Sequence, residues 1–157
     1  MMKGPHEYVA RLIWDGNTGE GTSSYGGYGR QYRVLMAGKP DIEGSADPIF
    51  RGDARKHNPE DLFVASLSSC HMLSYLALCA RQGVRVLAYE DDARGTLVVN
   101  EDGTGKFEEV TLRPSVTIAG NENVALALHL HDAASDQCFV ASSCSIPIRH
   151  KPTVKTG

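Results

Sequence analysis

The strongest constraint on the fold is one long apolar segment, residues 58–80, which reads NPEDLFVASLSSCHMLSYLALCA. Asn58 can cap the start of a helix, and Pro59 suits the first helical position because its missing N–H would have no partner there. Asp61 stands three residues after the cap, in a variant of the capping box, and Gly83 can take the left-handed conformation that ends a helix. The segment therefore predicts a single long helix.

This predicted helix is apolar on almost every side. A helix that is hydrophobic all round has to be covered by other structure. In a chain of 157 residues, complete cover can require a second copy of the protein. Its apolar residues are Leu62, Phe63, Val64, Ala65, Leu67, Met72, Leu73, Tyr75, Leu76, Ala77 and Leu78.

The composition suits one globular domain over residues 1–157, with 41% hydrophobic and 22% charged residues. The net charge of −3 gives no reason to expect nucleic acid or an acidic membrane as a partner. No apolar run is long enough to span a membrane without polar interruption, and the N-terminus lacks a signal-peptide pattern. We therefore expect a cytoplasmic protein. A solvated basic tail is expected at Arg149, His150, Lys151 and Lys155.

The first third of the chain is predicted to be β-structure. Residues 8–14 and 30–36 read as strands on either side of a glycine-rich loop, 16–29. Residues 42–48 form either a short third strand or a loop. The loop holds no phosphate-binding motif, and we assign it no cofactor.

Beyond the helix, residues 84–100 read as a strand, 100–105 as a turn and 107–118 as a second strand. Pro114 suggests that the second strand lies at a sheet edge or contains a bulge. One face of this strand is predicted to be buried and consists of Val110, Leu112, Val116 and Ile118. The other face is predicted to be solvent-exposed and consists of Glu109, Thr111, Arg113, Ser115 and Thr117.

A second helix is predicted over residues 123–137, followed by an edge strand over 145–151 that contains Pro147. Helices gathered on one side of an antiparallel sheet define an α+β fold. The residues at helical spacing in the second helix are Val124, Ala127, Leu128, His131, Ala134 and Cys138.

The chain has four cysteines, which in a reducing compartment favour chemistry or packing over a disulfide framework. Cys70 and Cys79 lie on the same helix about 13 Å apart along its axis, too far for a disulfide. Cys70 can pair only with Cys138 or Cys144, and Cys79 reads as an inert buried thiol. Cys70 itself is either a small packing residue or a nucleophile that needs a cation from elsewhere.

The segment NPEDLFVASLSSC resembles the cysteine helix of the OsmC/Ohr family of thiol-dependent peroxidases, in which the pattern is roughly NPE-x-L followed at a fixed interval by cysteine. Asn58, Pro59, Glu60, Leu62 and Cys70 fit this pattern. The segment DQCFVASSCSIPI is similar to the family's second mark, a cysteine after a second helix, here Cys138. The resemblance implies an OsmC-like fold, with antiparallel sheets wrapped around a central apolar helix in an intertwined homodimer.

The resemblance also implies a peroxidase of organic hydroperoxides and, less efficiently, of hydrogen peroxide, with no haem, flavin or metal. Cys70 would attack the peroxide and become a sulfenic acid, which Cys138 would resolve as a disulfide. A lipoyl or thioredoxin-like dithiol would then reduce the enzyme. Glu60 would hold a catalytic arginine, although it would favour the start of any helix and lies about 15 Å along the axis from Cys70.

The arginine is not identified by a clean match to the family pattern. The segment before the helix offers Arg51 and Arg55, and the segment after the glycine-rich loop offers Arg30 and Arg33. We favour Arg51. Without a clean match, two other functions stay open: a module that binds a small ligand in the apolar surroundings of Cys70, and a redox sensor.

The histidines predict no metal site. His129 and His131 are two residues apart, so in a helix they point about 200° apart and cannot bind one ion together with Asp132 and Cys138. His71 diverges from Cys70 by about 100° and is expected to be an interior or interface residue. The family commonly has a histidine three residues before the second cysteine, where this chain has Ser135.

Overall fold

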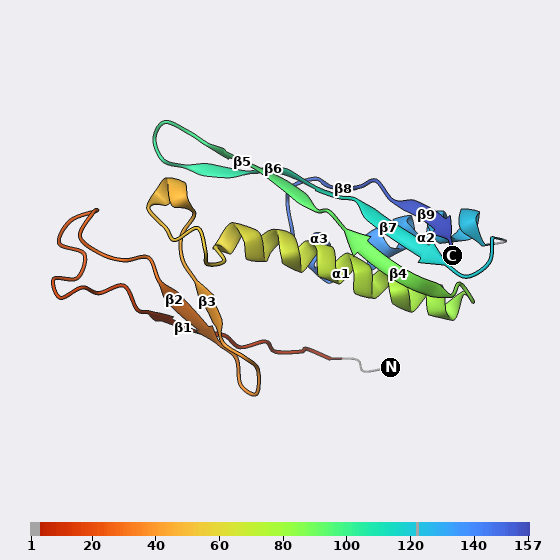
Figure 1. The fold of residues 1–157 in the computed structure, drawn as a ribbon, viewed down its shortest axis with the longest axis horizontal. Helices are drawn as coiled ribbons and strands as arrows, with labels where there is room; N and C mark the ends of the chain where they lie inside the picture. The colour runs from red at the N-terminus through yellow and green to blue at the C-terminus, as the bar shows by residue number, and fades with distance from the viewer. Residues whose placement is uncertain (1–3, 122) are drawn as a thin grey trace. The chain divides into compact units, whose positions relative to one another are not determined.

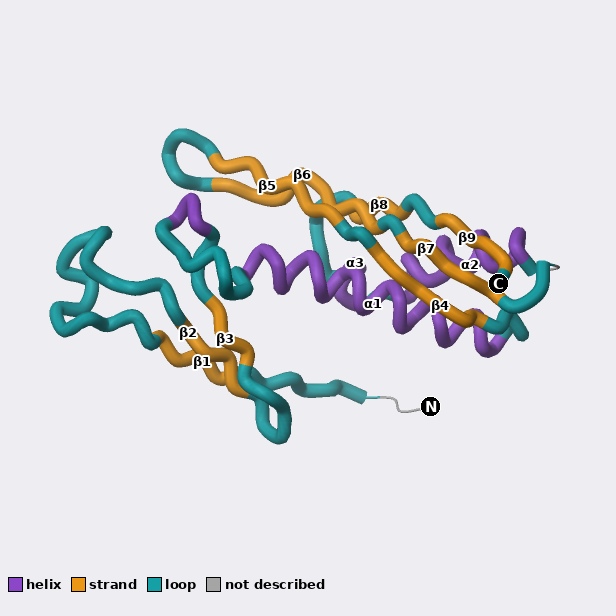
Figure 2. Tube along the Cα trace, viewed as in Figure 1, coloured by secondary structure: helices purple, strands orange, loops and turns teal. Residues whose placement is uncertain are grey.

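The computed structural model describes residues 4–121 and 123–157. The chain divides into two compact units, the first ending at Leu62 and the second beginning at Phe63, so that the boundary falls inside the long helix. Figures 1 and 2 show the elements of each unit. The single domain expected over residues 1–157 stays a prediction.

The first unit contains a small antiparallel sheet with the strand order β1-β2-β3. Its strands lie within the three predicted segments, and the glycine-rich loop joins the first two. This loop is closed at its base, where the Gly29 N–H donates to the Gly16 carbonyl at 2.8 Å. The elements are β1 (Arg11–Trp14), β2 (Tyr32–Leu35), β3 (Ile42–Gly44) and the 3₁₀ helix η1 (Pro48–Phe50).

The long helix α1 (Pro59–Arg81) begins and ends where its sequence predicts. Asp61 donates its N–H to Asn58 Oδ1 at 2.7 Å, and its carboxylate accepts the Asn58 N–H at 3.3 Å. At the other end Gly83 has φ 75°, and the Val84 N–H reaches back to the Cys79 carbonyl at 2.9 Å. Both ends are therefore fixed by local chemistry.

The second unit is built from two mixed sheets, with orders β4-β7-β9 and β5-β6-β8. In each sheet the central strand pairs antiparallel on one side and parallel on the other. The antiparallel sheets that were expected each gain one parallel pair, because the C-terminal strands return alongside β6 and β7 in the same direction. The elements are β4 (Val86–Asp91), β5 (Arg94–Val99), β6 (Gly105–Leu112), β7 (Pro114–Ile118), α2 (Val124–Gln137), α3 (Phe139–Ser142), β8 (Ile148–His150) and β9 (Thr153–Thr156).

The segments predicted as two long strands are each divided between the two sheets. The first becomes β4 and β5, and the second becomes β6 and β7, with the break at Arg113. Pro114 is the first residue of β7, which is the middle strand of its sheet, so the predicted edge is wrong. The segment does contain a bulge, but it lies in β6 opposite Thr96 and Leu97 rather than at Pro114. The first position of a strand tolerates a residue without an N–H.

The predicted burial pattern is confirmed for the apolar face of β6 and β7. It is wrong for one residue of β6 and one residue of α2. Thr111 was expected to be wet and is buried, with 5% of its surface exposed. Leu128 was expected to face the core and is 40% exposed, while Leu130 is buried in its place. The four confirmed core residues, each 1% exposed or less, are Val110, Leu112, Val116 and Ile118.

The C-terminal segment pairs into the sheets and is not a free tail, although Arg149, Lys151 and Lys155 are solvent-exposed as predicted. β8 pairs with β6 and β9 with β7, and Arg149 forms an ion pair with Glu109 at 2.9 Å. β8 is an edge strand, as Pro147 predicts. β9 and the short helix α3 have no counterpart in the sequence prediction.

Two apolar clusters form the core of the second unit, and α1 contributes to both. Tyr75 belongs to the α2 cluster, in which α1, α2 and the β4-β7-β9 sheet pack together, and Figure 1 shows the two helices beside this sheet. Leu67 belongs to the hairpin cluster with Val110 and Leu112 of β6. By length and composition alone α1 could cross a membrane, but the core helix of a folded domain meets the same test. The buried residues of the α2 cluster are Tyr75, Leu78, Cys79, Val84, Val116, Ile118, Ala127, Leu130 and Ala134.

Candidate active site

The second unit brings Cys70 of α1 against Cys138, the residue that follows α2. Cys70 is half-buried, Cys138 is buried, and both are free thiols. Burial raises the pKa of Cys138 to about 11, and a hydrogen bond between the Cys138 and Cys70 side chains adds to this shift. Of the two partners that the cysteine spacing left open for Cys70, the structure therefore places Cys138 near the Cys70 thiol.

Cys138 occupies the turn between two helices. It ends α2 in an extended conformation and caps α3, where its Sγ accepts the Ala141 N–H at 3.4 Å. A sulfur held in this way has a backbone donor for the negative charge of a thiolate. Phe139, the next residue, is 84% exposed.

The other two cysteines lie in different surroundings. Cys144 is half-buried in the hairpin cluster, and its thiol donates to the Val140 carbonyl at 3.2 Å. Cys79 is buried in the α2 cluster, and burial raises its pKa. A thiol held in the neutral form is a weak nucleophile, so the environment of Cys79 agrees with an inert residue.

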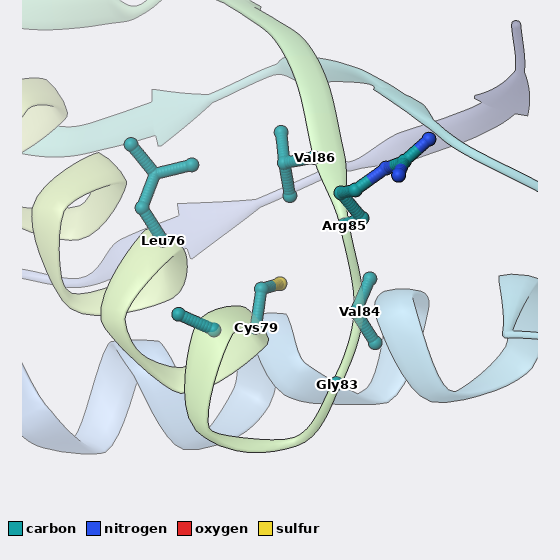
Figure 3. Close-up of a pocket in the computed structure, with 7 residues that line it drawn as sticks. Leu76, Cys79, Gly83, Val84, Arg85 and Val86 are labelled. Atoms are coloured by element: carbon teal, nitrogen blue, oxygen red, sulfur yellow. The ribbon is translucent and has the colours of Figure 1, made fainter.

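A pocket lies at the C-terminal end of α1. Figure 3 shows Cys79 among its lining residues, with the Arg85 guanidinium extending away from the thiol. The pocket does not include Cys70. Its lining is mainly apolar and consists of Leu76, Cys79, Ala80, Gly83, Val84, Arg85 and Val86.

Several polar side chains form hydrogen bonds close to Cys70 in the sequence of α1. Ser68 of α1 donates to Asp91 at 2.5 Å, and the Arg113 N–H donates to the same carboxylate at 2.7 Å. Beside Cys70, the Nε2 atom of His71 lies 3.0 Å from the Nδ1 atom of His131 on α2. We call the side chains of Ser68, His71, Asp91 and His131 the polar layer.

The two histidines of the polar layer are almost completely enclosed, with 1% of His71 and none of His131 exposed. Burial is the main cause that lowers both pKa values, to about 4 for His71 and about 3 for His131. The His131 ring stacks on Tyr75 with 3.8 Å between centroids. Its Nε2 atom has no hydrogen-bond partner among the described residues. The pair is thus neutral and rigidly held.

The sequence missed this pair, although one signal for it was present. His131 occurs at helical spacing with Ala127 and Ala134, which are buried with it in α2. His129, two residues earlier, is exposed and contacts Asp132 at 3.8 Å, so the two histidines do point apart. Among the residues that the structure describes, no group of three or more metal-ligating side chains gathers to hold an ion.

Three of the four candidate arginines of the first unit are already engaged. Arg33 pairs with Asp15 at 2.7 Å and Arg55 with Asp53 at 3.0 Å. The Arg30 guanidinium lies over two tyrosine rings and donates to backbone carbonyls in the glycine-rich loop. These contacts account for the charges of the three side chains.

Arg51 differs from the other three candidates. Within residues 4–121 and 123–157 it forms no ion pair, and its φ of 66° makes it the one described non-glycine residue with a left-handed backbone. Its N–H donates to the Pro48 carbonyl at 3.0 Å and so ends η1. Backbone strain of this kind gathers at functional sites.

Glu60 lies half-buried in the first turn of α1. Burial and then the nearby charges of Glu60 and Asp61 raise the pKa of Tyr32. No ion pair joins Glu60 to an arginine within the described part of the chain. The roles expected of Arg51 and Glu60 toward Cys70 stay predictions.

A cysteine-bearing apolar helix packed with a second helix against mixed sheets defines an α+β protein with an OsmC-like fold. A solved OsmC-like protein of unknown function from Vibrio cholerae matches 95% of this chain and 100% of its own, with 30% identity and a TM-score of 0.84. The family model described as OsmC-like protein matches residues 52–152. This chain belongs to the OsmC-like family, and the predicted family and fold are confirmed.

More distant structures share this fold. An organic hydroperoxide resistance protein from Elizabethkingia anophelis is 20% identical, with a TM-score of 0.69 over 99% of this chain and 100% of its own. Another, OhrB from Bacillus subtilis, is also 20% identical, with a TM-score of 0.59 over 94% of this chain and 98% of its own. A search of curated protein sequences gave no match.

Proposed function

We propose that this protein is a cysteine-based peroxidase that reduces organic hydroperoxides and, less efficiently, hydrogen peroxide. The observation that carries this proposal is that the Cys138 side chain lies close enough to Cys70 for the two thiols to influence each other's protonation. A half-exposed thiol is open to a peroxide, and a buried thiol beside it can capture the oxidised product. Membership of a family whose fold is shared by organic hydroperoxide resistance proteins supports it.

The reaction has two steps at these sulfurs. The Cys70 thiolate attacks the terminal oxygen of the hydroperoxide, the O–O bond breaks, and the alkoxide takes a proton to leave as an alcohol. Cys70 is then a sulfenic acid. Cys138, as a thiolate, attacks the Cys70 sulfur and displaces hydroxide to form a disulfide, and an external dithiol, lipoyl or thioredoxin-like, restores both thiols.

The proposal assigns Arg51 to the stabilisation of the Cys70 thiolate and of the departing alkoxide. What supports this choice is that Arg51 has no carboxylate partner among the residues that the structure describes, whereas Arg33 and Arg55 each have one. Glu60 would orient the arginine through a charge-assisted pair.

The proposal includes a homodimer, acting in the cytoplasm. Leu73, in the middle of α1, is 63% exposed, and Ala65 and Ser69 continue the exposed side of the helix at intervals of four residues. A large apolar side chain in this position is suited to contact with a second copy. That contact would supply the remaining cover for an otherwise apolar helix.

A second candidate function is the binding of a small apolar ligand without turnover. The mainly apolar pocket at the end of α1 favours it, because ligand sites are typically apolar with a few polar groups. This pocket would bind its ligand independently of Cys70.

Peroxide consumption separates the two functions. Wild-type protein, Cys70→Ser and Cys79→Ser receive cumene hydroperoxide with excess dithiothreitol, and the remaining peroxide is followed over time. The peroxidase proposal expects turnover in the wild type and Cys79→Ser, and none above background in Cys70→Ser. Equal rates for Cys70→Ser and wild type would refute it.

A further inference from the structure

The buried pair of His71 and His131 has no part in the proposed peroxidase steps. It nevertheless joins the two segments that carry the reacting thiols. His71 directly follows Cys70 on α1, and His131 lies on α2 seven residues before Cys138. Seven residues make about two helical turns, which places His131 and Cys138 on nearly the same face of α2, about 10 Å apart along its axis.

The surroundings of the pair make its hydrogen bond directional. The two ring planes lie within 7° of each other, with 3.0 Å between the bonded nitrogens. The His131 ring is stacked on Tyr75, and the Tyr75 hydroxyl donates to the Ala127 carbonyl of α2 at 3.1 Å. The His71 ring stacks on His150 with 5.7 Å between centroids, so each ring is oriented by a second contact.

Breaking the His71–His131 hydrogen bond is costly because neither buried histidine can form a replacement hydrogen bond with water. An imidazole that loses its partner in an apolar interior keeps the full desolvation penalty of its polar atom. Apolar contacts in the α2 cluster tolerate small sliding movements, whereas a hydrogen bond at fixed ring positions does not. Together with the Tyr75–Ala127 hydrogen bond, the pair therefore limits how far α1 can be displaced along α2.

We infer that the His71–His131 hydrogen bond is a positioning device that holds α1 and α2 in the register at which Cys138 reaches Cys70. The inference rests on the proposed function, in which these two cysteines form a disulfide. A disulfide needs its Cα atoms within about 7 Å, so a slip of α2 by a fraction of a turn separates the sulfurs. Neither histidine touches a reacting atom.

The test uses diamide, which oxidises two nearby thiols to a disulfide and is itself reduced to the hydrazine, so that no peroxidase activity is required. His131→Leu removes the bonded nitrogen, and His131→Asn keeps a polar atom near the Nδ1 position. His129→Asn on the same helix is the matched control. The Cys70–Cys138 linkage is followed by peptide mass spectrometry, and Cys70 alkylation by iodoacetamide is followed in parallel.

We expect His131→Leu to slow formation of the linkage by about tenfold, with Cys70 alkylation within about twofold of wild type. His131→Asn and His129→Asn should form the linkage at close to the wild-type rate. Equal rates for His131→Leu and wild type would overturn the inference, as would an equal slowing of the Leu and Asn variants.

Two additional experiments, one with His71 variants and one with a different oxidant, cover a failure of the first variant to fold and a failure of the proposed function. If His131→Leu does not fold, as judged by circular dichroism, His71→Leu and His71→Gln give the same comparison from the other helix, because glutamine can place a polar atom near Nε2. Cumene hydroperoxide replaces diamide in the second arm. A histidine effect with diamide but no linkage with peroxide supports the positioning role while refuting the peroxidase. Rapid peroxide-driven linkage in every variant refutes the positioning role alone.

Discussion

The Sγ atom of Cys138 lies 3.4 Å from the backbone nitrogen of Ala141, whose N–H it accepts. A serine hydroxyl forms the same kind of cap at the start of a helix. Replacement of Cys138 by serine therefore preserves the local structure while it removes the thiol. This makes the resolving step open to a clean test.

We predict that Cys138→Ser reacts with one equivalent of hydroperoxide and then stops at the sulfenic acid of Cys70. Labelling with dimedone and mass spectrometry should find a persistent adduct at Cys70 that is absent from the wild type. Cys144→Ser is the control and should resolve normally. A Cys70–Cys144 disulfide formed at the wild-type rate in Cys138→Ser would instead make Cys144 the resolving thiol.

Replacement of Arg51 by glycine should separate activity from stability. Loss of a charge-assisted contact to the reacting oxygen should lower kcat/KM by about 10- to 100-fold. Because glycine adopts a positive φ without strain, Arg51→Gly should be about 1 kcal/mol more stable than Arg51→Ala in urea unfolding. Arg55→Ala, which breaks only an exposed pair with Asp53, should leave peroxidase activity unchanged. Full activity in Arg51→Gly would remove this arginine from the mechanism.

The buried histidine pair should make the protein less stable in mild acid. Both pKa values lie below the ordinary 6.5, so the unfolded chain binds protons that the folded chain does not. The stabilisation is present above pH 6.5 and is lost as the pH falls toward about 4. The charged and titratable groups that face the pair are His150, Asp91 and Asp132.

Urea unfolding at pH 7 and pH 5 measures this effect, for which we expect a fall of about 2 kcal/mol for each of the two histidines. The double variant His71→Gln/His131→Asn should show a smaller difference between the two pH values. His129→Asn should behave as the wild type does. Equal stability of the wild type at pH 7 and pH 5 would contradict a neutral buried pair.

The exposed side of α1 predicts how the protein associates. Leu73→Lys places a charge in the proposed contact between copies and should convert a dimer to a monomer in size-exclusion chromatography with light scattering. Leu87→Lys alters a leucine of β4 that is also exposed and should leave the mass unchanged. A wild-type protein that is monomeric at micromolar concentration would rule out a stable dimer.

Local chemistry explains which parts of the fold were predictable. The ends of α1 follow from Asn58, Asp61 and Gly83, whose hydrogen bonds and backbone angles involve only near neighbours. The alternation around Val110 and Val116 likewise identified the buried face of β6 and β7. These signals depend on contacts or periods of a few residues, which a sequence displays directly.

Long-range pairing explains what was missed. β9 joins the sheet through parallel pairing with β7. The residues around Thr153 contain no local pattern that indicates this distant strand as the pairing partner. His71 and His131 are 60 residues apart, and their bond exists only because α1 and α2 pack at one particular register. The proximity of Cys70 and Cys138 has the same origin, and only the family resemblance, rather than spacing, pointed to Cys138 over Cys144.

The most direct test of the account is a single-turnover titration. Fully reduced protein receives one equivalent of cumene hydroperoxide, and free thiols and disulfide-linked peptides are counted by mass spectrometry. We predict rapid loss of two thiols and a peptide pair linked through Cys70 and Cys138. Survival of all four thiols after several minutes would mean that Cys70 is not an activated nucleophile, and the peroxidase proposal would fail.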